Sequence, residues 1–461
     1  MSDDTIFAPS TAPGRAGVAV IRVSGPGAGL AICTIGGSAL PPPRKAALRV
    51  LVDPATGEPI DRGLLLWFPG PASFTGEDLG ELHLHGGRAV VAAALDALAG
   101  LPGLRPAEPG EFTRRAFDNG KLDLSEVEGL VDLIDAGTEA QRRQALRQLE
   151  GGLARLTGGW ATRLTRVLAH VEAAIDFAEE ALPASLEQAA LGEALAVAGE
   201  IAAALDDRHR GERLRDGLSV VILGAPNAGK SSLLNALARR DVAIVSEIAG
   251  TTRDVVEVQL DLGGYPVVLA DTAGLRELEE AAGSPAAGQA AIERLGMARA
   301  RERAAVADVT LLMVDLEAAA RDGGGLDAVG ALYDSRSILV LNKADRCDRA
   351  AIAALCRQLE DRAPVVISAA TGEGLDALLE RLVARAGDLL GGEGAAVITR
   401  LRHRRALEEC RDALERSQEA TLPELQAEEL RLALRALGRI SGRVDVEDLL
   451  DVVFREFCIG K

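Results

Sequence analysis

Aromatic residues are scarce in this chain, at 3% of 461 residues, although 48% of all residues are hydrophobic. Alanine, leucine and glycine must therefore fill the core, and such a composition favours helices. Basic residues are also outnumbered, with 51 Lys and Arg against 69 Asp and Glu, so that the net charge is -18. This balance argues against a broad nucleic-acid-binding surface, because an RNA backbone needs positive charge opposite it. Any RNA contact is expected to be local or shared with a partner.

Cysteine pairs, a signal segment and long apolar runs are missing as well. The five cysteines are scattered and form no C-x-x-C pair, which is typical of a reducing cytoplasm and gives no zinc signature. The N-terminus is acidic and no apolar segment follows it, so we expect no signal peptide. No apolar run has the length of a membrane span. These observations predict a cytoplasmic protein without a membrane contact.

The most informative stretch is residues 224–231, with the sequence GAPNAGKS. An apolar run at 218–223 predicts a strand before it, and residues 232–237 predict the start of a helix after it. Strand, glycine-rich loop and helix together are the context in which a G-x-x-x-x-G-K-S pattern binds phosphate. Backbone N–H groups turn toward the phosphates, Lys230 adds charge at the outer phosphates, and the Ser231 hydroxyl can bind magnesium. The helix N-terminus adds its partial positive charge.

Three further motifs each follow a predicted strand, at 271–274 (DTAG), 342–345 (NKAD) and 368–370 (SAA). In the first motif, the aspartate can hold the magnesium shell and the glycine can sense the outermost phosphate. Asp345 in the second motif can accept both hydrogen bonds that guanine offers from N1 and its exocyclic amine, which adenine cannot provide. The third motif can close over the base. Four motifs in this order predict a guanine-nucleotide domain and resemble the Ras-like GTPases of translation-factor type.

The first part of the chain has the alternating patterns of a mixed α+β domain. Three strands and then one helix are expected, at 17–23, 64–68, 79–85 and 88–98. His83 and His85 would share one face of the third strand, so a metal site is conceivable there, but no third ligand is evident. Structural histidines are the favoured interpretation.

Helical periodicity covers 122–216 and resumes from Thr399 to the end, punctuated by Pro423 and Gly438. In the first region we expect helices at 139–156, broken by glycines at 151–152, and at 160–178 and 186–205. Helical stretches on both sides of the nucleotide motifs suggest one helical domain with the nucleotide domain inserted, and two separate helical domains are the alternative. The length suggests about three domains. We divide the chain at 1–118, 119–215, 216–385 and 386–461.

A second set of patterns is more specific than the phosphate loop. It comprises PGR at 13–15, IRVSG at 21–25, FTGED at 74–78, PGEFT at 109–113, NGKLDL at 119–124 and the terminal FCIGK at 457–461. These segments resemble the MnmE family, also called TrmE, and with the nucleotide motifs the resemblance spans essentially the whole chain. It implies an α/β plus all-α protein with an N-terminal α+β domain of the folate-binding type, a helical domain and an inserted Ras-like P-loop GTPase domain.

The resemblance also implies a function and partners. The family's members are potassium-activated GTPases that act with a flavoprotein, MnmG. The pair modifies carbon 5 of the wobble uridine in certain tRNAs, adding an aminomethyl or carboxymethylaminomethyl group with a one-carbon unit from 5-formyl- or methylene-tetrahydrofolate. A homodimer through the N-terminal domain and a heterotetramer with the flavoprotein are implied too. A stand-alone regulatory or ribosome-assembly GTPase is the alternative, and a folate-dependent aminomethyltransferase with a passenger GTPase is a third function.

The family's motifs assign roles to residues of this sequence. By the resemblance, folate contacts Arg22, Glu81, Lys121 and Lys461. Magnesium takes Ser231 and Thr252, and potassium takes Asn227, Ser246, Ile248 and Thr251. The GTP-binding residues are Asn227, Ala228, Gly229, Lys230, Ser231, Ser232, Ser246, Glu247, Ile248, Ala249, Gly250, Thr251, Thr252, Asp271, Thr272, Ala273, Gly274, Asn342, Lys343, Asp345, Ser368, Ala369 and Ala370.

GTP hydrolysis needs a group that orients the attacking water. Leu275, directly after the DTAG motif, cannot do this. The family supplies a glutamate from an E-R-x-G segment, which is Glu293 in this sequence. An Ala/Gly-rich piece longer than expected for the family precedes it, so Glu279 and Glu280 are rival carboxylates. In the C-terminal tail, Cys458 is either a nucleophile or a small buried residue.

Overall fold

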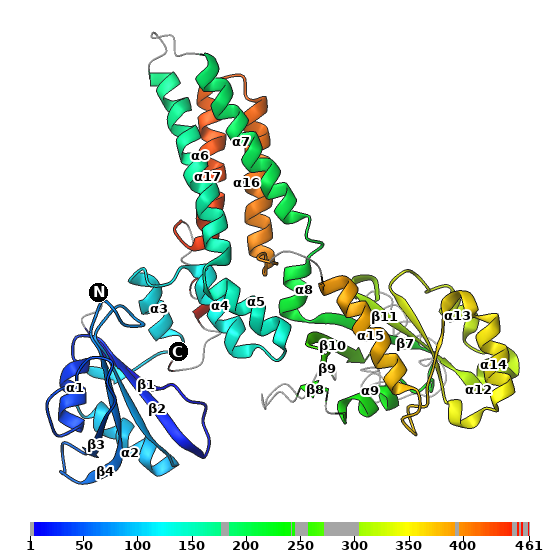
Figure 1. Cartoon of the computed structure of the whole chain (residues 1–461), viewed down its shortest axis with the longest axis horizontal. Helices are drawn as coiled ribbons and strands as arrows, with labels where there is room; N and C mark the ends of the chain where they lie inside the picture. Colours follow the sequence, from blue (N-terminus) through cyan, green and yellow to red (C-terminus); the bar gives the residue numbers. More distant parts are fainter. Residues whose placement is uncertain are drawn as a thin grey trace, which may run out of the picture. The chain divides into compact units, whose positions relative to one another are not determined.

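The computed structural model describes residues 4–176, 184–240, 242–244, 257–271, 304–391, 396–444, 450, 453–454 and 460. The chain divides into two units. Unit 1 combines residues 1–134, 147–202 and 405–461, and unit 2 combines residues 135–146 and 203–404. Each unit is therefore assembled from segments that are far apart in the sequence, as the colours of Figure 1 show.

Unit 1 begins with a six-stranded sheet in the order β3-β4-β5-β2-β1-β6. β6 pairs parallel with β1, and the other neighbours are antiparallel. The strands are β1 (Thr5–Pro9), β2 (Ala16–Ser24), β3 (Ala47–Val52), β4 (Pro59–Phe68), β5 (Leu79–Gly86) and β6 (Leu104–Pro106). Helices α1 (Ala28–Ile35) and α2 (Arg88–Ala99) cover one face, where Ile21, Val23 and Leu82 are buried. The strands and the helix predicted for this region are confirmed.

The other face of the same sheet carries exposed apolar side chains. Leu64 on β4 pairs with Leu48 on β3 and with His83 on β5, so these side chains point to one side of the sheet. Leu48 is 51% exposed and Val50, two residues further along β3, is 50% exposed. Val20 on β2 pairs with His83 and joins this side. We name the surface formed by Val20, Leu48, Val50 and Leu64 the open sheet face.

Four long helices lie side by side in unit 1 (Figure 1). They are α6 (Gly152–Asp176), α7 (Ala184–Leu205), α16 (Leu401–Glu419) and α17 (Pro423–Ser441). Arg431 Nη2 on α17 donates to Glu172 Oε1 on α6 at 2.9 Å, and Gln418 Nε2 on α16 donates to the carbonyl oxygen of Leu191 on α7 at 3.3 Å. Helices before the nucleotide motifs therefore pack with helices after them. Two shorter helices, α3 (Glu111–Asp118) and α4 (Leu124–Asp135), precede this bundle in the sequence.

Two helix boundaries differ from the sequence-based expectation. The sequence predicts a break at Gly438, but α17 continues through it to Ser441. A Cβ atom at Gly438 would lie 2.8 Å from Val444 Cγ2, so close packing accounts for this glycine. The predicted break at 151–152 does occur, because Gly151 adopts φ +77°, but the next helix begins at Gly152 and not near 160.

Among the described residues, the segment Gln188–Leu205 of α7 is long and apolar enough to cross a membrane by length and composition. The expectation that no such run exists is therefore wrong. However, Glu193 and Glu200 lie within this segment, and both bind Arg163 on α6. Ionised side chains inside a membrane span are costly, and Ile201 is fully buried in the protein. The contacts of α7 are those of a helix in a bundle.

Unit 2 contains a seven-stranded sheet in the order β13-β12-β11-β7-β10-β9-β8. Its strands are β7 (Leu218–Gly224), β8 (Ala243–Ile244), β9 (Glu257–Leu262), β10 (Tyr265–Asp271), β11 (Val309–Asp315), β12 (Ser337–Asn342) and β13 (Val365–Val366). The sheet is parallel except at the edge, where β9 and β8 run antiparallel to their neighbours.

Helices cover both faces of this sheet. One face packs against α9 (Lys230–Ala238) and α15 (Leu375–Leu390), and the other against α12 (Leu316–Asp322), α13 (Leu326–Gly330) and α14 (Arg349–Gln358). A mostly parallel sheet between two helical layers is the Ras-like architecture that the motifs predict. Together with the bundle of unit 1, it confirms the predicted fold class, α/β plus all-α.

The two ends of segment 203–404 meet at a buried ion cluster. Arg404, which is 4% exposed, donates from Nη2 to Asp207 Oδ1 at 2.6 Å and from Nε to Glu212 Oε1 at 2.7 Å. Burial by itself raises the pKa of Glu212, but the hydrogen bonds and charge of Arg404 outweigh burial and hold this pKa below its ordinary value. The cluster therefore joins the segment just before the sheet of unit 2 to the segment just after it.

Helix α5 (Glu139–Leu149) also supports unit 2. Gln141 Nε2 donates to the carbonyl oxygen of Arg215 at 2.9 Å, and Gln144 Nε2 donates to that of Gly211 at 3.0 Å, both in α8 (Arg210–Asp216). A backbone N–H in the first turn of α5 donates to the turn between β9 and β10 at 3.1 Å. The start of α5 therefore packs against the sheet of unit 2, although α6 and α7 lie between α5 and this sheet in the sequence.

Candidate functional site

Strand β7 ends at Gly224 and α9 begins at Lys230, so a short loop follows the carboxyl end of the strand. Asn227 and Gly229 in this loop adopt φ angles of +63° and +99°, which asparagine and glycine tolerate better than most residues. Lys230 Nζ donates to the carbonyl oxygens of Gly224 at 3.0 Å and Ala225 at 3.1 Å. The loop therefore holds the ammonium beside the N-terminus of α9, the end of a helix that favours anions.

Asn342, at the end of β12, connects this loop to a second one. Its side chain is buried, and its Nδ2 donates to the carbonyl oxygen of Ala228 at 2.7 Å. Its Oδ1 accepts a hydrogen bond from the backbone N–H of Ala369 at 3.0 Å. A Cβ atom at Gly229 would lie 2.2 Å from Asn342 Nδ2, so the bridge needs glycine at that position. One amide side chain thus fixes three motifs relative to one another.

Asp345 follows in the 3-10 turn Ala344–Arg346 and is exposed. Its Oδ1 accepts a hydrogen bond from the Oγ of the buried Ser368 at 2.6 Å. The same Oγ accepts a hydrogen bond from the backbone N–H of Thr371 at 3.2 Å. Ser368 therefore orients the carboxylate that the sequence assigns to base recognition.

Asp315, at the end of β11, is a member of this cluster that the sequence analysis missed. Its Oδ2 accepts a hydrogen bond from Lys343 Nζ at 2.6 Å. Burial by itself raises the pKa of Asp315, but this hydrogen bond, with those from the backbone of Ala318 and Glu317, outweighs burial and lowers the pKa. The sequence does contain a signal for Asp315, because it directly follows the largely apolar run 309–314, just as the DTAG and NKAD motifs follow their strands.

The carboxyl ends of parallel strands meet at one edge of a sheet. At this edge the structure brings together Asn227, Ala228, Gly229, Lys230, Ser231, Ser232, Asn342, Lys343, Asp345, Ser368, Ala369 and Ala370. Asp271 ends β10 at the same edge. Other predicted residues lie outside the described part of the chain, namely Ser246, Glu247, Ile248, Ala249, Gly250, Thr251, Thr252, Thr272, Ala273, Gly274 and Glu293, together with Cys458 and Lys461.

A second polar cluster lies on the sheet of unit 1. Arg22 Nε donates to Glu81 Oε1 at 3.0 Å, and His83 Nε2 lies 3.1 Å from Glu81 Oε2. The guanidinium carbon of Arg22 lies 5.4 Å from the centre of the Phe74 ring. Lys121 Nζ donates to a carbonyl oxygen of the loop that carries Phe74, at 3.1 Å. Arg22, Glu81 and Lys121 are therefore grouped around one loop, between β4 and β5.

The two histidines of β5 bind different acids. His83 binds Glu81, whereas His85 Nδ1 lies 2.9 Å from Asp61 Oδ1 on β4. Burial by itself raises the pKa of Asp61, but the hydrogen bonds from His85 outweigh burial and lower it. In the part of the chain that the structure describes, no group of three His, Cys, Asp or Glu side chains could hold a metal ion.

Gly460 lies against the end of β1, a strand of the same sheet. Ser10 Oγ donates to the carbonyl oxygen of Gly460 at 2.9 Å. Gly460 adopts φ +98°, and a Cβ atom there would lie 1.9 Å from the carbonyl oxygen of Pro9, so a side chain does not fit. Pro9 pairs with Ile21, the residue before Arg22. Gly460 therefore lies at the end of β1, next to the strand that carries Arg22.

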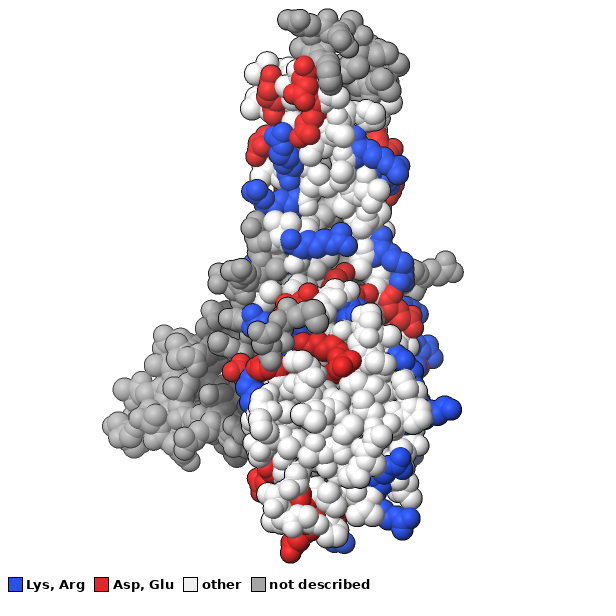
Figure 2. Space-filling view, turned by 90° about the vertical axis from the view of Figure 1, so that its left-hand side faces the viewer, with Lys and Arg blue, Asp and Glu red and all other residues white. Residues whose placement is uncertain are grey.

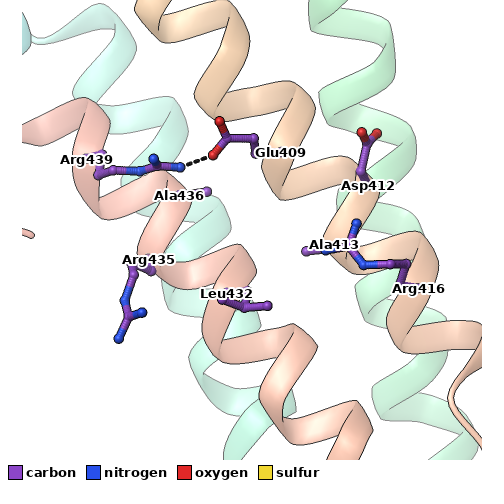
Figure 3. A pocket seen from close by; sticks show the side chains of 8 residues that line it. All are labelled: Glu409, Asp412, Ala413, Arg416, Leu432, Arg435, Ala436 and Arg439. Carbon is purple, nitrogen blue, oxygen red and sulfur yellow. Dashed lines mark hydrogen bonds and ion pairs between the residues drawn. The ribbon is translucent and has the colours of Figure 1, made fainter. Parts of the chain in front are cut away.

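A cavity of about 440 Å³ lies between α16 and α17. Its lining residues, shown in Figure 3, are Glu409, Asp412, Ala413, Arg416, Leu432, Arg435, Ala436 and Arg439. Arg439 pairs with Glu409, and Arg416 pairs with Glu429. Figure 2 likewise shows basic and acidic side chains intermingled on the helical part of unit 1. Such balanced charge does not favour an RNA backbone.

The chain resembles known proteins over its full length. The family model described as the MnmE helical domain matches residues 124–458, and the one described as the GTP-binding protein TrmE N-terminus matches residues 5–121. The tRNA modification GTPase MnmE of Rhodospirillum rubrum is 54% identical over 473 residues, covering 100% of both chains. Its counterpart in Parvibaculum lavamentivorans is 55% identical, covering 99% of this chain and 100% of that one. The 5-taurinomethyluridine tRNA synthase subunit GTPB3 of rat mitochondria is 49% identical, covering 99% and 93%.

Proposed function

Since this chain belongs to the MnmE family of tRNA modification GTPases, we propose that it modifies carbon 5 of the wobble uridine in certain tRNAs together with an MnmG-like flavoprotein. The chain is a GTP hydrolase that acts in tRNA modification. The full-length match supports the finer proposal, because it includes both the GTPase unit and the polar cluster of unit 1. The rat relative is named for a uridine substituted at position 5. The group added here would be aminomethyl or carboxymethylaminomethyl.

The chain binds GTP with magnesium, and we propose the edge of the sheet in unit 2 as the place where it does so. We propose Ser231 and Thr252 as the magnesium ligands. Potassium would be held by oxygens of Asn227, Ser246, Ile248 and Thr251. Asn227 is exposed in the phosphate loop, and this supports the proposal because its side-chain oxygen is accessible to a cation. Bound there, potassium would neutralise the negative charge that develops as the terminal phosphate leaves.

We propose that the polar cluster of unit 1 binds a tetrahydrofolate derivative through Arg22, Glu81, Lys121 and Lys461. The donor set fits such a molecule. A carboxylate has about four acceptor positions, so Glu81 can accept hydrogen bonds from a pterin as well as from Arg22 and His83. Basic side chains suit the glutamate carboxylates of folate, and Phe74 offers a ring face next to Arg22. The docked Gly460 supports a role for the tail, because Lys461 follows it directly.

We propose that the chain forms a homodimer through the open sheet face. A second copy is the occupant that fits, because Leu48 and Val50 on this face are about half exposed and the face lies on the sheet of the proposed folate site. The exposed leucines and valine would leave water on contact, which is the main driving force of such association. The homodimer would bind the flavoprotein and form a heterotetramer with it. We place this complex in the cytoplasm.

The substitution Leu64→Asp tests the dimer. A carboxylate at the centre of an apolar contact is costly to bury, and a two-fold interface counts the cost twice, so dimerisation should weaken by about 10-fold or more. Light scattering during size-exclusion chromatography measures the masses. The control is Leu30→Asp, which places the same charge at an exposed leucine of α1 on the covered side of the sheet. A Leu64→Asp protein that remains as dimeric as the control would contradict the proposed interface.

The proposed function is tested by mass spectrometry of tRNA nucleosides. Cells without this protein should lack the modified wobble uridine, and the unmodified chain should restore it. Lys230→Ala should restore little, since losing a charge from a phosphate site costs about 10²-fold or more in turnover. Lys45→Ala, at an exposed lysine in unit 1, should restore the modification fully.

Two outcomes of this experiment favour the alternatives. Unchanged wobble uridines in cells without the protein would indicate a stand-alone regulatory or ribosome-assembly GTPase. Full modification with Lys230→Ala would indicate a folate-dependent aminomethyltransferase that does not need its GTPase unit.

A further inference from the structure

Each polar side chain of the NKAD motif has a protein partner that fixes it. Asn342 bridges to the backbone of Ala228, and Asp345 is held by Ser368. Lys343, between Asn342 and Asp345 in the sequence, has a φ of +69°, and its ammonium binds the carboxylate of Asp315. The first two partners belong to the predicted GTP-binding set. Asp315 belongs to none of the nucleotide motifs.

The two oxygens of Asp315 do different work. Oδ1 caps helix α12 by accepting hydrogen bonds from the backbone N–H groups of Glu317 at 3.1 Å and Ala318 at 3.4 Å. Oδ2 accepts the hydrogen bond from Lys343 at 2.6 Å. Asp315 also pairs directly with Asn342 across the parallel strands β11 and β12. The carboxylate is thus fixed by a helix and a strand before it meets the lysine.

We propose that Asp315 is a positioning residue for guanine-nucleotide binding, which acts by holding Lys343 and does not itself contact the nucleotide; this inference rests on the GTP site proposed above. A lysine side chain has several freely rotating bonds, and ordering it on binding costs free energy. The ion pair with a capped, immobile carboxylate removes much of that cost before the nucleotide arrives. The effect belongs to the base end of the site, so it is the same for GTP and GDP.

The variant Asp315→Asn separates the two roles. Asparagine caps helices as well as aspartate does, so the contacts of Oδ1 persist, while an amide in place of Oδ2 loses the charge that holds Lys343. We expect the Kd values of GTP and GDP to rise about 10-fold, which corresponds to the cost of ordering one lysine side chain. The loss should fall on KM more than on kcat. The melting temperature should stay within about 2 °C of that of the unmodified protein.

Two comparisons complete the test, with Kd measured by titration with fluorescent GTP and GDP. Asp334→Asn removes the carboxylate that pairs with Arg336 in the same unit, away from the nucleotide motifs, and should leave both Kd values unchanged. In a Lys343→Met background, Asp315→Asn should have no further effect, because its partner is gone. Unchanged Kd values for Asp315→Asn, or an equal loss in the Lys343→Met background, would overturn the proposal. So would a lower affinity accompanied by a matching fall in melting temperature.

Discussion

Asp345→Asn should shift the preference of the nucleotide site from GTP toward xanthosine triphosphate. A carboxylate offers two acceptors to the guanine N1 and exocyclic amine, whereas an amide offers one acceptor and one donor. Oδ1 is oriented by Ser368, so the exchange changes the chemistry of the side chain more than its direction. We expect GTP binding to weaken by about 2–5 kcal/mol, because polar groups of the base are left unpaired.

Titrations with both nucleotides measure this shift. The control is Asp348→Asn, three residues further along. Asp348 Oδ1 caps α14 by accepting the backbone N–H of Ala351 at 2.7 Å, and asparagine keeps this cap. The control should retain the original preference. An unchanged Kd for GTP in Asp345→Asn would show that this carboxylate does not read the base.

Glu293→Ala should bind GTP normally but lose most of its hydrolysis, by roughly 10²-fold or more, the usual scale for a positioned acid or base. The reason is that Leu275 follows the DTAG motif where related GTPases have a water-orienting side chain. We propose that Glu293 supplies a carboxylate that accepts a hydrogen bond from the attacking water. Single-turnover hydrolysis in potassium and in sodium at equal ionic strength measures the rate.

Two further variants give this experiment its contrasts. Glu279 and Glu280 replaced together test the rival carboxylates, and a slow double variant beside a fast Glu293→Ala would refute the assignment. Asn227→Ala should hydrolyse GTP in potassium only as fast as the unmodified protein does in sodium, with GTP binding retained. Equal rates of the unmodified protein in the two salts would contradict potassium activation.

The strand ends that meet at the proposed nucleotide site could be predicted because each motif is local. An apolar run followed by a glycine-rich or acidic turn needs no knowledge of the rest of the chain. The bonds that join the motifs are not local. Asn342 and Ala228 are 114 residues apart in the sequence, and Lys343 and Asp315 are 28 apart. Only the order of the parallel strands brings these pairs together, so the bridge made by Asn342 and the ion pair of Asp315 with Lys343 became visible only in the structure.

Helices were predicted less well than strands, for a physical reason. Glycine has a low helix propensity, so Gly438 predicts a break when it is considered alone. In the structure its missing side chain makes room for Val444, a packing requirement that periodicity does not reveal. The apolar face of α7 gives a similar ambiguity, since bundle helices and membrane spans share its composition. Its pairing with Arg163 distinguishes the two.

The buried cluster around Arg404 makes the nucleotide unit resemble a cassette with its two chain ends tied at one point. Because its two ends lie together, such a segment can be inserted into another protein without distorting the fold of either. Helix α5 sets a condition on any exchange, because Gln141 and Gln144 bind α8 from a segment outside the cassette. A transplanted piece limited to 203–404 would leave those backbone carbonyls without their amide partners. The transferable module therefore includes residues 135–146 as well as residues 203–404.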